Sequence, residues 1–182
     1  MDTASMDTTT RSGFGPVEIH SARGLDPALR EILEVWFKEE FGQTIYQWSP
    51  ADWYAVVKAD GDPVGRLGIL ARTIAVGGDA VQVGGIAGVA TRPEWRHRGV
   101  ASVLMRAAAQ FIQQDLKCPF GLLLCRRAVS PVYANLGWRP VVGPTSFEQP
   151  RGVTTYRSLT MVMQFGERQW RDGAIDLRGL PW

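Results

Sequence analysis

The centre of the chain places a strand, a basic turn and a helix in direct succession, and this order limits what the chain can fold into. Apolar residues predict a long strand over Ala80–Thr91. The turn has the spacing R-x-x-G-x-A at Arg96–Ala101, and apolar residues at helical spacing predict a helix from there to about Asp115. Several glycines interrupt the strand, which is typical of a bulge or of close approach by another molecule.

The turn has the chemistry of an anion site. A helix N-terminus leaves about four backbone N–H groups without internal partners and carries about half a positive charge. Gly99 allows close approach to the backbone, Ala101 is small, and Arg96 and Arg98 add positive charge. The turn therefore favours a pyrophosphate, although an ordinary basic helix start fits the same six residues.

Size and composition predict one cytoplasmic domain. The chain has 182 residues and a formal net charge of +2, which gives no argument for nucleic acid. Its two cysteines have no metal-binding spacing, and no apolar stretch approaches the roughly 18 residues of a membrane span. We expect a disordered tail over residues 1–15 and a domain over 16–182, with a C-terminal extension at 166–182.

Local patterns predict the other elements. Strands are expected at Val17–His20, Trp53–Ala59, Val64–Val76, Phe120–Cys125, Trp138–Val142 and Thr154–Phe165. Helices are expected from Asp26-Pro27 to Phe41-Gly42 and over Ser130–Leu136. Residues 43–52 fit a short helix or a loop.

Residues 89–105, V-A-T-R-P-E-W-R-H-R-G-V-A-S-V-L-M, resemble motif A of the GCN5-related N-acetyltransferases (GNAT). The resemblance implies an α/β (α+β) domain with a central mixed, mostly antiparallel twisted sheet, a splayed central strand pair and flanking helices. It also implies that the splayed strand pairs with the pantetheine arm of acetyl-CoA, chiefly at Val89 and Thr91. The implied cofactor-binding residues are Val89, Ala90, Thr91, Arg96, His97, Arg98, Gly99, Val100 and Ala101.

A second stretch, S-P-V-Y-A-N-L-G-W at Ser130–Trp138, resembles motif B of the same family. Tyr133 matches the tyrosine that faces the CoA sulfur, which implies a general acid for the leaving thiolate. The unperturbed pKa values of a phenol and a thiol, about 10 and 8.5, suit this role. Asn135 is a further candidate for cofactor binding, and a half-buried packing role for Tyr133 is the alternative.

The C-terminal third resembles aminoglycoside 2′-N-acetyltransferases. The likeness rests on Gly143–Ser146, on W-R-D-G at 170–173 and on the final Trp182. The tail also resembles the end of the nodulation N-acyltransferase, which acylates chitooligosaccharides. Trp182 is then either a packing anchor or the holder of a terminal carboxylate that reaches the acceptor. The chain departs from the aminoglycoside enzymes at Ala87, where they carry Glu, and it lacks their acidic run around Glu148.

The resemblance implies direct attack of an amine on the thioester, with a backbone N–H, plausibly that of Val89, stabilising the oxyanion. The amine must lose a proton, and the candidate acceptors of that proton are the Trp182 carboxylate acting through water, Asp52, Glu148, Asp172 and His20.

The predicted function is an acetyl-CoA-dependent N-acetyltransferase that acts without a metal on a primary amine of a small molecule, such as an amino sugar or aminoglycoside. The alternatives are a non-sugar acceptor (polyamine, amino acid or peptide), a longer acyl donor, and a non-catalytic CoA-binding sensor. We expect no nucleic-acid or membrane partner, and a homodimer is left open.

Overall fold

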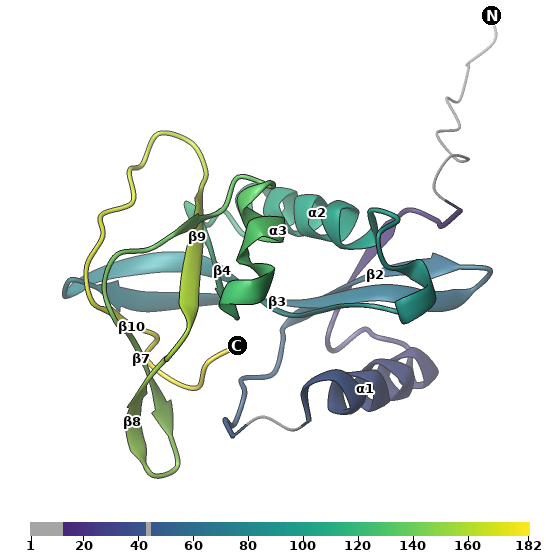
Figure 1. Cartoon of the computed structure of the whole chain (residues 1–182), viewed down its shortest axis with the longest axis horizontal. Helices are drawn as coiled ribbons and strands as arrows, with labels where there is room; N and C mark the ends of the chain where they lie inside the picture. Colours follow the sequence, from purple (N-terminus) through teal and green to yellow (C-terminus); the bar gives the residue numbers. More distant parts are fainter. Residues whose placement is uncertain (1–12, 43–44) are drawn as a thin grey trace, which may run out of the picture.

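A mixed β-sheet forms the centre of the molecule, with one helix on one face and two on the other (Figure 1). In the computed structural model, which describes residues 13–42 and 45–182, the sheet has ten strands. The first helix, α1 (Pro27–Phe41), lies on the side opposite α2 (Val100–Gln114) and α3 (Ser130–Ala134). The predicted α/β sheet with flanking helices is confirmed.

The strands are β1 (Val17–Ser21), β2 (Trp53–Ala59), β3 (Asp62–Val76), β4 (Asp79–Thr91), β5 (Phe120–Cys125), β6 (Arg139–Pro140), β7 (Thr145–Gln149), β8 (Gly152–Thr155), β9 (Leu159–Gln164) and β10 (Ile175–Asp176). The order along the sheet is β6-β9-β5-β4-β3-β10-β7-β8, and β2 pairs with both β1 and β3. Among these described strands, only the β4–β5 and β7–β10 pairs are parallel. Short 3₁₀ turns occupy Pro93–Trp95 and Arg127–Val129.

The two parallel central strands part halfway along their length. Hydrogen-bonded pairing between β4 and β5 covers Val83–Ile86 on β4 and Phe120–Leu123 on β5. Beyond Ile86, β4 stays paired with β3 as far as Thr91, while the end of β5 stays paired with β9. Within the described residues, the facing edges of the two strands have no strand partner after this point. The predicted splayed pair is therefore confirmed.

A β-bulge in β4 lies directly after the last pair. Arg66 of β3 faces Ala90 and Gly68 faces Ala87, so β4 has one more residue than β3 over this stretch. Gly88 has a φ of +54°, and a Cβ there would lie 3.0 Å from the Phe37 ring. A side chain at this position would be strained by the backbone conformation and would press on the Phe37 ring. Because a bulge bends its strand, this residue favours the parting of β4 from β5.

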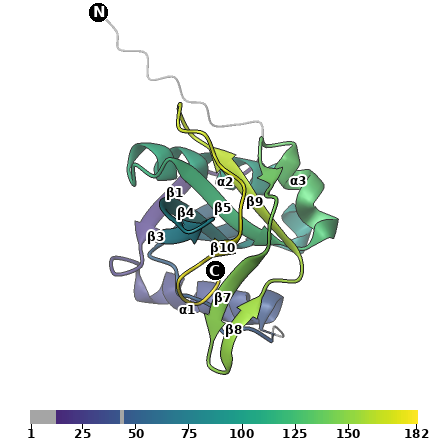
Figure 2. The same cartoon turned by 90° about the vertical axis from the view of Figure 1, so that its left-hand side faces the viewer.

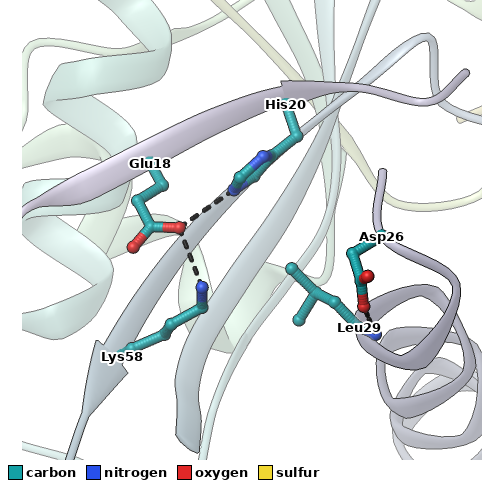
Figure 3. A network of polar contacts seen from close by, with 5 residues as sticks. All are labelled: Glu18, His20, Asp26, Leu29 and Lys58. Carbon is teal, nitrogen blue, oxygen red and sulfur yellow. Dashed lines mark hydrogen bonds and ion pairs between the residues drawn. The ribbon is translucent and has the colours of Figure 1, made fainter. Parts of the chain in front are cut away.

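Helix α1 begins as the sequence predicts. The Asp26 side chain accepts hydrogen bonds from the backbone N–H group of Ala28 at 3.0 Å and from that of Leu29 at 3.1 Å. Figure 3 shows the bond to Leu29. Pro27 occupies the first turn, where its missing N–H costs nothing. The helix buries Leu33 and Trp36 toward the sheet and ends before Gly42. Gln43 lies outside the described residues, and residues 45–52 form a loop.

The C-terminal third differs from the prediction. The single strand expected at Thr154–Phe165 is wrong: β8 and β9 are separate strands with residues 156–158 between them. The strand expected at Trp138–Val142 is reduced to β6. Strands β7 and β10 were not predicted, and the β7–β8 hairpin extends to the same side of the sheet as α1 (Figures 1 and 2). Side chains from distant segments, rather than local periodicity, set these boundaries.

The tail turns back into the molecule instead of leaving it. Both views place the C-terminus near the middle of the structure (Figures 1 and 2). Trp170 packs edge-on against Phe120, with 5.1 Å between ring centroids, and Trp182 is buried. A Cβ on Gly85 would lie 2.5 Å from the Trp182 indole, so the ring rests directly on the backbone of β4. Trp182 is therefore part of the core.

Residues 13–15 contact the body of the protein, since the Gly15 N–H donates to the Lys58 carbonyl and Phe14 packs against Trp95. The rest of the predicted tail, residues 1–12, lies outside the described residues. In the described part of the chain, none of the helices combines the length and the apolar character that crossing a bilayer requires.

The contact between Trp182 and Gly85 gives a stability prediction. Gly85→Ala should lower the free energy of unfolding by about 1–3 kcal/mol, because the new methyl overlaps a rigid ring. In a Trp182→Val background most of this penalty should disappear, as urea denaturation would measure.

The control is Gly84→Ala, whose methyl would meet Ile112 on the other face of β4, 2.3 Å away. Its penalty should be the same with and without Trp182. Equal penalties for Gly85→Ala in both backgrounds would mean that Trp182 does not rest on this strand.

Candidate functional site

A cavity of about 820 Å³ opens where β4 and β5 part. Its walls come from the two strands, from α1, from the loop before β2, from α3 and from the C-terminus. The residues of the parted strands that line it are Ile86, Ala87, Gly88, Val89, Leu123, Leu124 and Cys125. Of the predicted cofactor-binding residues on β4, Val89 lines the cavity, whereas Ala90 is buried beside α1 and Thr91 ends the strand.

The charges around the cavity are mostly positive. Its cationic side chains are Arg30, Lys38, Arg66, Arg126 and Arg157, whereas Glu34 is the only acidic side chain of the described residues that lines it. Ala87, the position at which the resemblance to the aminoglycoside enzymes implies Glu, also lines the cavity.

All four tyrosines of the chain line this cavity, and Tyr133 enters it from α3. Burial, together with the nearby Cys125, raises the pKa of Tyr133 to about 12. The phenol is therefore neutral at physiological pH and can donate a hydrogen bond. Tyr156, from the segment between β8 and β9, has its pKa raised to about 12, chiefly by burial.

The surroundings of Cys125, which also lines the cavity, raise the pKa of its thiol. Burial raises its pKa to about 11, because the low-polarity surroundings disfavour a thiolate. Any other thiol in the same place would experience the same penalty.

Trp182 is the one predicted proton acceptor that lines the cavity. Its indole N–H donates to the Leu122 carbonyl at 3.3 Å, and the Arg72 guanidinium lies 5.1 Å from its ring centroid. Arg72 also donates to the carbonyls of Leu177 and Leu180. These contacts fix the last residues of the chain against β3, β4 and β5.

The other candidate acceptors lie elsewhere. Asp52 and Glu148 are exposed and do not line the cavity. Asp172 is structural, since it accepts hydrogen bonds from the Trp170 indole and the Val142 N–H.

His20 belongs to a separate surface network on β1 and β2. The Glu18 carboxylate lies 3.1 Å from the His20 ring and 2.9 Å from the Lys58 ammonium (Figure 3). The hydrogen bond from Lys58 is the main reason why the pKa of Glu18 is lowered.

The basic turn lies beyond the cavity, at the end of β4. Gly99 is the N-cap of α2 with a φ of +86°, and a Cβ there would meet nothing within 4 Å. The backbone is therefore open to approach at the helix start, where N–H groups have no partner within the helix. His97 also has a positive φ, of 62°. Val100 is buried at the first helical position and Ala101 follows it.

The two arginines of the turn already have contacts within the protein. The Arg96 side chain donates to the Thr91 carbonyl at 3.2 Å and lies 3.3 Å from the Glu40 carboxylate. The Arg98 guanidinium lies 4.9 Å from the Trp95 ring centroid. Arg96 thus ties the turn to the end of β4 and to α1, a role that the spacing alone does not predict.

Asn135 stands apart from the rest of the predicted site. It is exposed, it ends α3, and it does not line the cavity. Sequence reasoning also missed several lining residues, above all Arg66 of β3, Tyr54 of β2 and Glu34 of α1. The alternating faces of β3 could have placed Arg66 opposite Leu67, but not beside a cavity. Among the described residues, no group of His, Cys, Asp or Glu could hold a metal ion.

Comparison with known proteins agrees with this geometry. An aminoglycoside 2′-N-acetyltransferase from Mycolicibacterium fortuitum is 26% identical over 152 residues, which cover 84% of this chain and 69% of the relative.

Among solved structures, Escherichia coli ElaA superposes with a TM-score of 0.62 at 14% identity, covering 83% of this chain and 99% of the other. The E. coli GNAT family N-acetyltransferase YhbS, in complex with CoA, has a TM-score of 0.59 at 16% identity, and the match covers 95% of this chain and 98% of the other. An acyl-CoA N-acyltransferase from Pseudomonas aeruginosa has a TM-score of 0.58 at 16% identity, and the match covers 80% of this chain and 97% of the other. At these identities the likeness concerns the fold.

The model of the acetyltransferase (GNAT) domain family matches residues 28–141, which is more than half of the chain and runs from α1 to the start of the C-terminal third. The parted β4–β5 pair, the bulge and the helix-capping turn all lie in this range. The chain therefore belongs to the GNAT acetyltransferase family.

Proposed function

We propose that this protein transfers an acetyl group from acetyl-CoA to a primary amine of a small molecule. The observation that carries the proposal is the continuous path along β4. The strand loses its β5 partner after Ile86, lines the cavity through Val89, and ends at Thr91, five residues before Arg96 of the turn. A long ligand with an anionic end can follow this path from the cavity to the start of α2.

The residues along the path fit acetyl-CoA. The unpaired edge of β4 offers backbone groups of the kind that pair with the amides of a pantetheine arm. At the end of the strand, the turn offers helix N-terminal N–H groups and a left-handed glycine with open space in front of it. His97 and Arg98 are exposed beside that glycine. Acetyl-CoA supplies an activated thioester, and the chain must supply binding, orientation and proton transfer.

Proton removal from the amine is assigned to the Trp182 carboxylate, directly or through a water molecule. An ordinary alkyl amine carries a proton at neutral pH and cannot attack until it is lost. Trp182 is buried, lines the cavity, and is held by its indole hydrogen bond to Leu122. The amine nitrogen then attacks the thioester carbonyl carbon, and the N–H of Val89 at the bulge is the proposed donor to the carbonyl oxygen.

Tyr133 is the proposed donor of the proton to the departing sulfur. Its pKa of about 12 keeps it protonated. The surroundings that raise the pKa of Cys125 to about 11 would also disfavour a CoA thiolate, so the leaving sulfur needs a proton and the neutral phenol can donate one. As the C–S bond breaks, the sulfur takes the phenolic proton, and the phenol regains a proton from solvent. The nitrogen that has attacked loses its second proton to solvent, and the Trp182 carboxylate also passes its proton on to solvent. The net products are the N-acetylated amine, free CoA and one proton.

The cavity charges argue against a strongly cationic acceptor. Among the described residues, five cationic side chains line the cavity and one acidic side chain does, so a polycationic aminoglycoside would be repelled. A less charged amine, including a simple amino sugar or an amino acid, is favoured. A longer acyl donor and a non-catalytic sensor are the remaining alternatives. The cytoplasmic location, the homodimer and the absence of a metal stay predictions.

Replacement of the helix-capping glycine tests where the cofactor binds. Gly99→Val should weaken CoA binding at least tenfold by isothermal titration calorimetry, because a β-branched residue cannot hold a φ of +86° and the N–H groups would turn away.

Gly78→Val is the matched control. Gly78 has a φ of +95° and open surroundings like Gly99, but it lies in the β3–β4 turn at the other end of β4. It should cost similar stability and leave CoA affinity within about twofold. Equal loss of affinity in both variants would locate CoA elsewhere.

Removal of the Tyr133 hydroxyl tests its role as the acid. Tyr133→Phe should lower turnover by roughly 10²–10⁴-fold, measured as free thiol release from acetyl-CoA with a panel of amines, while CoA still binds. Tyr156→Phe removes a phenol with a similar pKa from the same cavity and should retain at least tenfold more turnover than Tyr133→Phe. Normal turnover in Tyr133→Phe would remove the residue from the mechanism. If no amine reacts while CoA binds tightly, the sensor alternative is correct.

A further inference from the structure

Arg66 is a buried cation in the wall of the cavity. It lies on β3 at the position opposite the β4 bulge, and only 4% of its surface is exposed. Its neighbours on the two flanking strands, Val56 and Ala90, belong to the apolar cluster beneath α1. Arg66 therefore points to the face of the sheet that carries α1, and it also lines the cavity.

The contacts of its guanidinium are incomplete. Nη1 donates to the Leu33 carbonyl of α1 at 2.9 Å. The guanidinium carbon lies 5.1 Å from the Phe37 ring centroid and 5.6 Å from that of Tyr54. Nε is buried and has no hydrogen-bond partner. In residues 13–42 and 45–182, no carboxylate lies within ion-pair distance of Arg66.

A buried charge without a counter-ion is costly, and proteins place one where a ligand supplies the opposite charge. Desolvation lowers the pKa of Arg66 to about 10, so the side chain still carries its charge at neutral pH. The two aromatic rings hold the cation but do not neutralise it. The missing partner is therefore an anion that enters from the cavity.

The free edge of the guanidinium suits a carboxylate. With Nη1 held by Leu33, the remaining side carries Nε and Nη2, which point the same way and match the two oxygens of a carboxylate. A Cβ on Gly88 would lie 3.6 Å from Nη2, so this end of the guanidinium lies next to the bulge of β4. A phosphate would need further donors for its third oxygen.

The same face of the sheet also carries Trp182. The indole rests on Gly85, which pairs with Leu70 of β3, four residues from Arg66 on the same side of the strand. At about 3.3 Å per residue, the two positions are about 13 Å apart. Between them the lining residues of the sheet are small: Gly68, Ala87 and Gly88. A small molecule can lie on this floor with one end at the cation and its amine toward the parted strands.

We propose that Arg66 binds a carboxylate of the acceptor, so that the amine acetylated by this protein also carries a carboxylate group. The inference rests on the proposed function, because it takes the cavity as the acceptor site. The apolar walls, which include Leu25, Phe37 and Phe41, favour an amino acid with an apolar body over a sugar.

Matched acceptors test this without any mutation. Leucine, phenylalanine and 6-aminohexanoate are each compared with their amides, which keep the amine and lose the negative charge. Thiol release from acetyl-CoA by the full-length protein should give a kcat/KM at least tenfold higher for the carboxylate member of the preferred pair. Equal values within every pair, with measurable turnover, would overturn the inference and leave the proposed function intact.

Variants assign the effect to Arg66. Arg66→Gln should raise the KM for the carboxylate acceptor about 10–100-fold with kcat within about threefold, and should bring the carboxylate-to-amide ratio close to one. Arg66→Lys keeps the charge but not the two-donor edge, so its KM and its carboxylate-to-amide ratio should lie between those of the wild type and of Arg66→Gln. Arg126→Gln, an exposed arginine on the same cavity, should keep the ratio. An unchanged carboxylate-to-amide ratio in Arg66→Gln would overturn the inference. If that variant does not fold, the ratio in Arg66→Lys and the comparison of acids with amides in the wild type provide the test.

A binding experiment separates this inference from the proposed function. 4-Methylpentanoate and its amide have no amine and cannot be acetylated. Calorimetry with the wild-type protein should detect the acid and not the amide, and Arg66→Gln should lose the difference. If no amine reacts but the acid binds through Arg66, the carboxylate site stands and the acetyltransferase proposal fails. If neither compound binds and turnover is the same for acids and amides, the carboxylate inference is refuted and the acetyltransferase proposal stands.

Discussion

The fold and its chemistry depend on the point at which β4 and β5 stop exchanging backbone hydrogen bonds, after Ile86 and Leu123. A sheet that continued past this point would have no cavity at its centre. Gly88 allows the bulge that bends β4, and Trp182 fills the face of the sheet just before the parting. The tail thus supports the β4–β5 pair next to the parting, since its indole contacts the backbone of β4 at Gly85 and donates a hydrogen bond to the Leu122 carbonyl of β5.

Much of this centre could be predicted because its signals are local. The strand with glycines, the R-x-x-G-x-A turn and the amphipathic helix after it each have a pattern within a few residues, and so does the Asp26 cap of α1. The C-terminal third could not be predicted in the same way. Strand β10 has two residues and is held between β3 and β7, so no periodicity can reveal it. Residues 156–158 interrupt a run of strand-forming residues for reasons of tertiary packing.

The residues of the candidate site also differ in whether a local sequence pattern could reveal them. Tyr133 could be found from its motif. Arg66, by contrast, is one of two arginines in a mostly apolar strand and has no motif around it. Its significance comes from what surrounds it in space: the Leu33 carbonyl, two aromatic rings, and no carboxylate within the described residues. Together with Ala87, Arg66 gives the cavity a lining whose charge does not suit a polycationic acceptor. The family is therefore established by the fold and the motifs, while the acceptor is a question of charge and burial.

Amide hydrogen exchange measured by NMR, with and without CoA, tests the central claim most directly. If the parted edge of β4 and the start of α2 hold the cofactor, CoA should slow exchange at Val89 and Thr91 and at residues 99–101 by at least tenfold. Amides of the β3–β4 turn at residues 77–78, at the other end of the strand, should not change. Protection that appears elsewhere, with no change at Val89 and Thr91, would contradict the account.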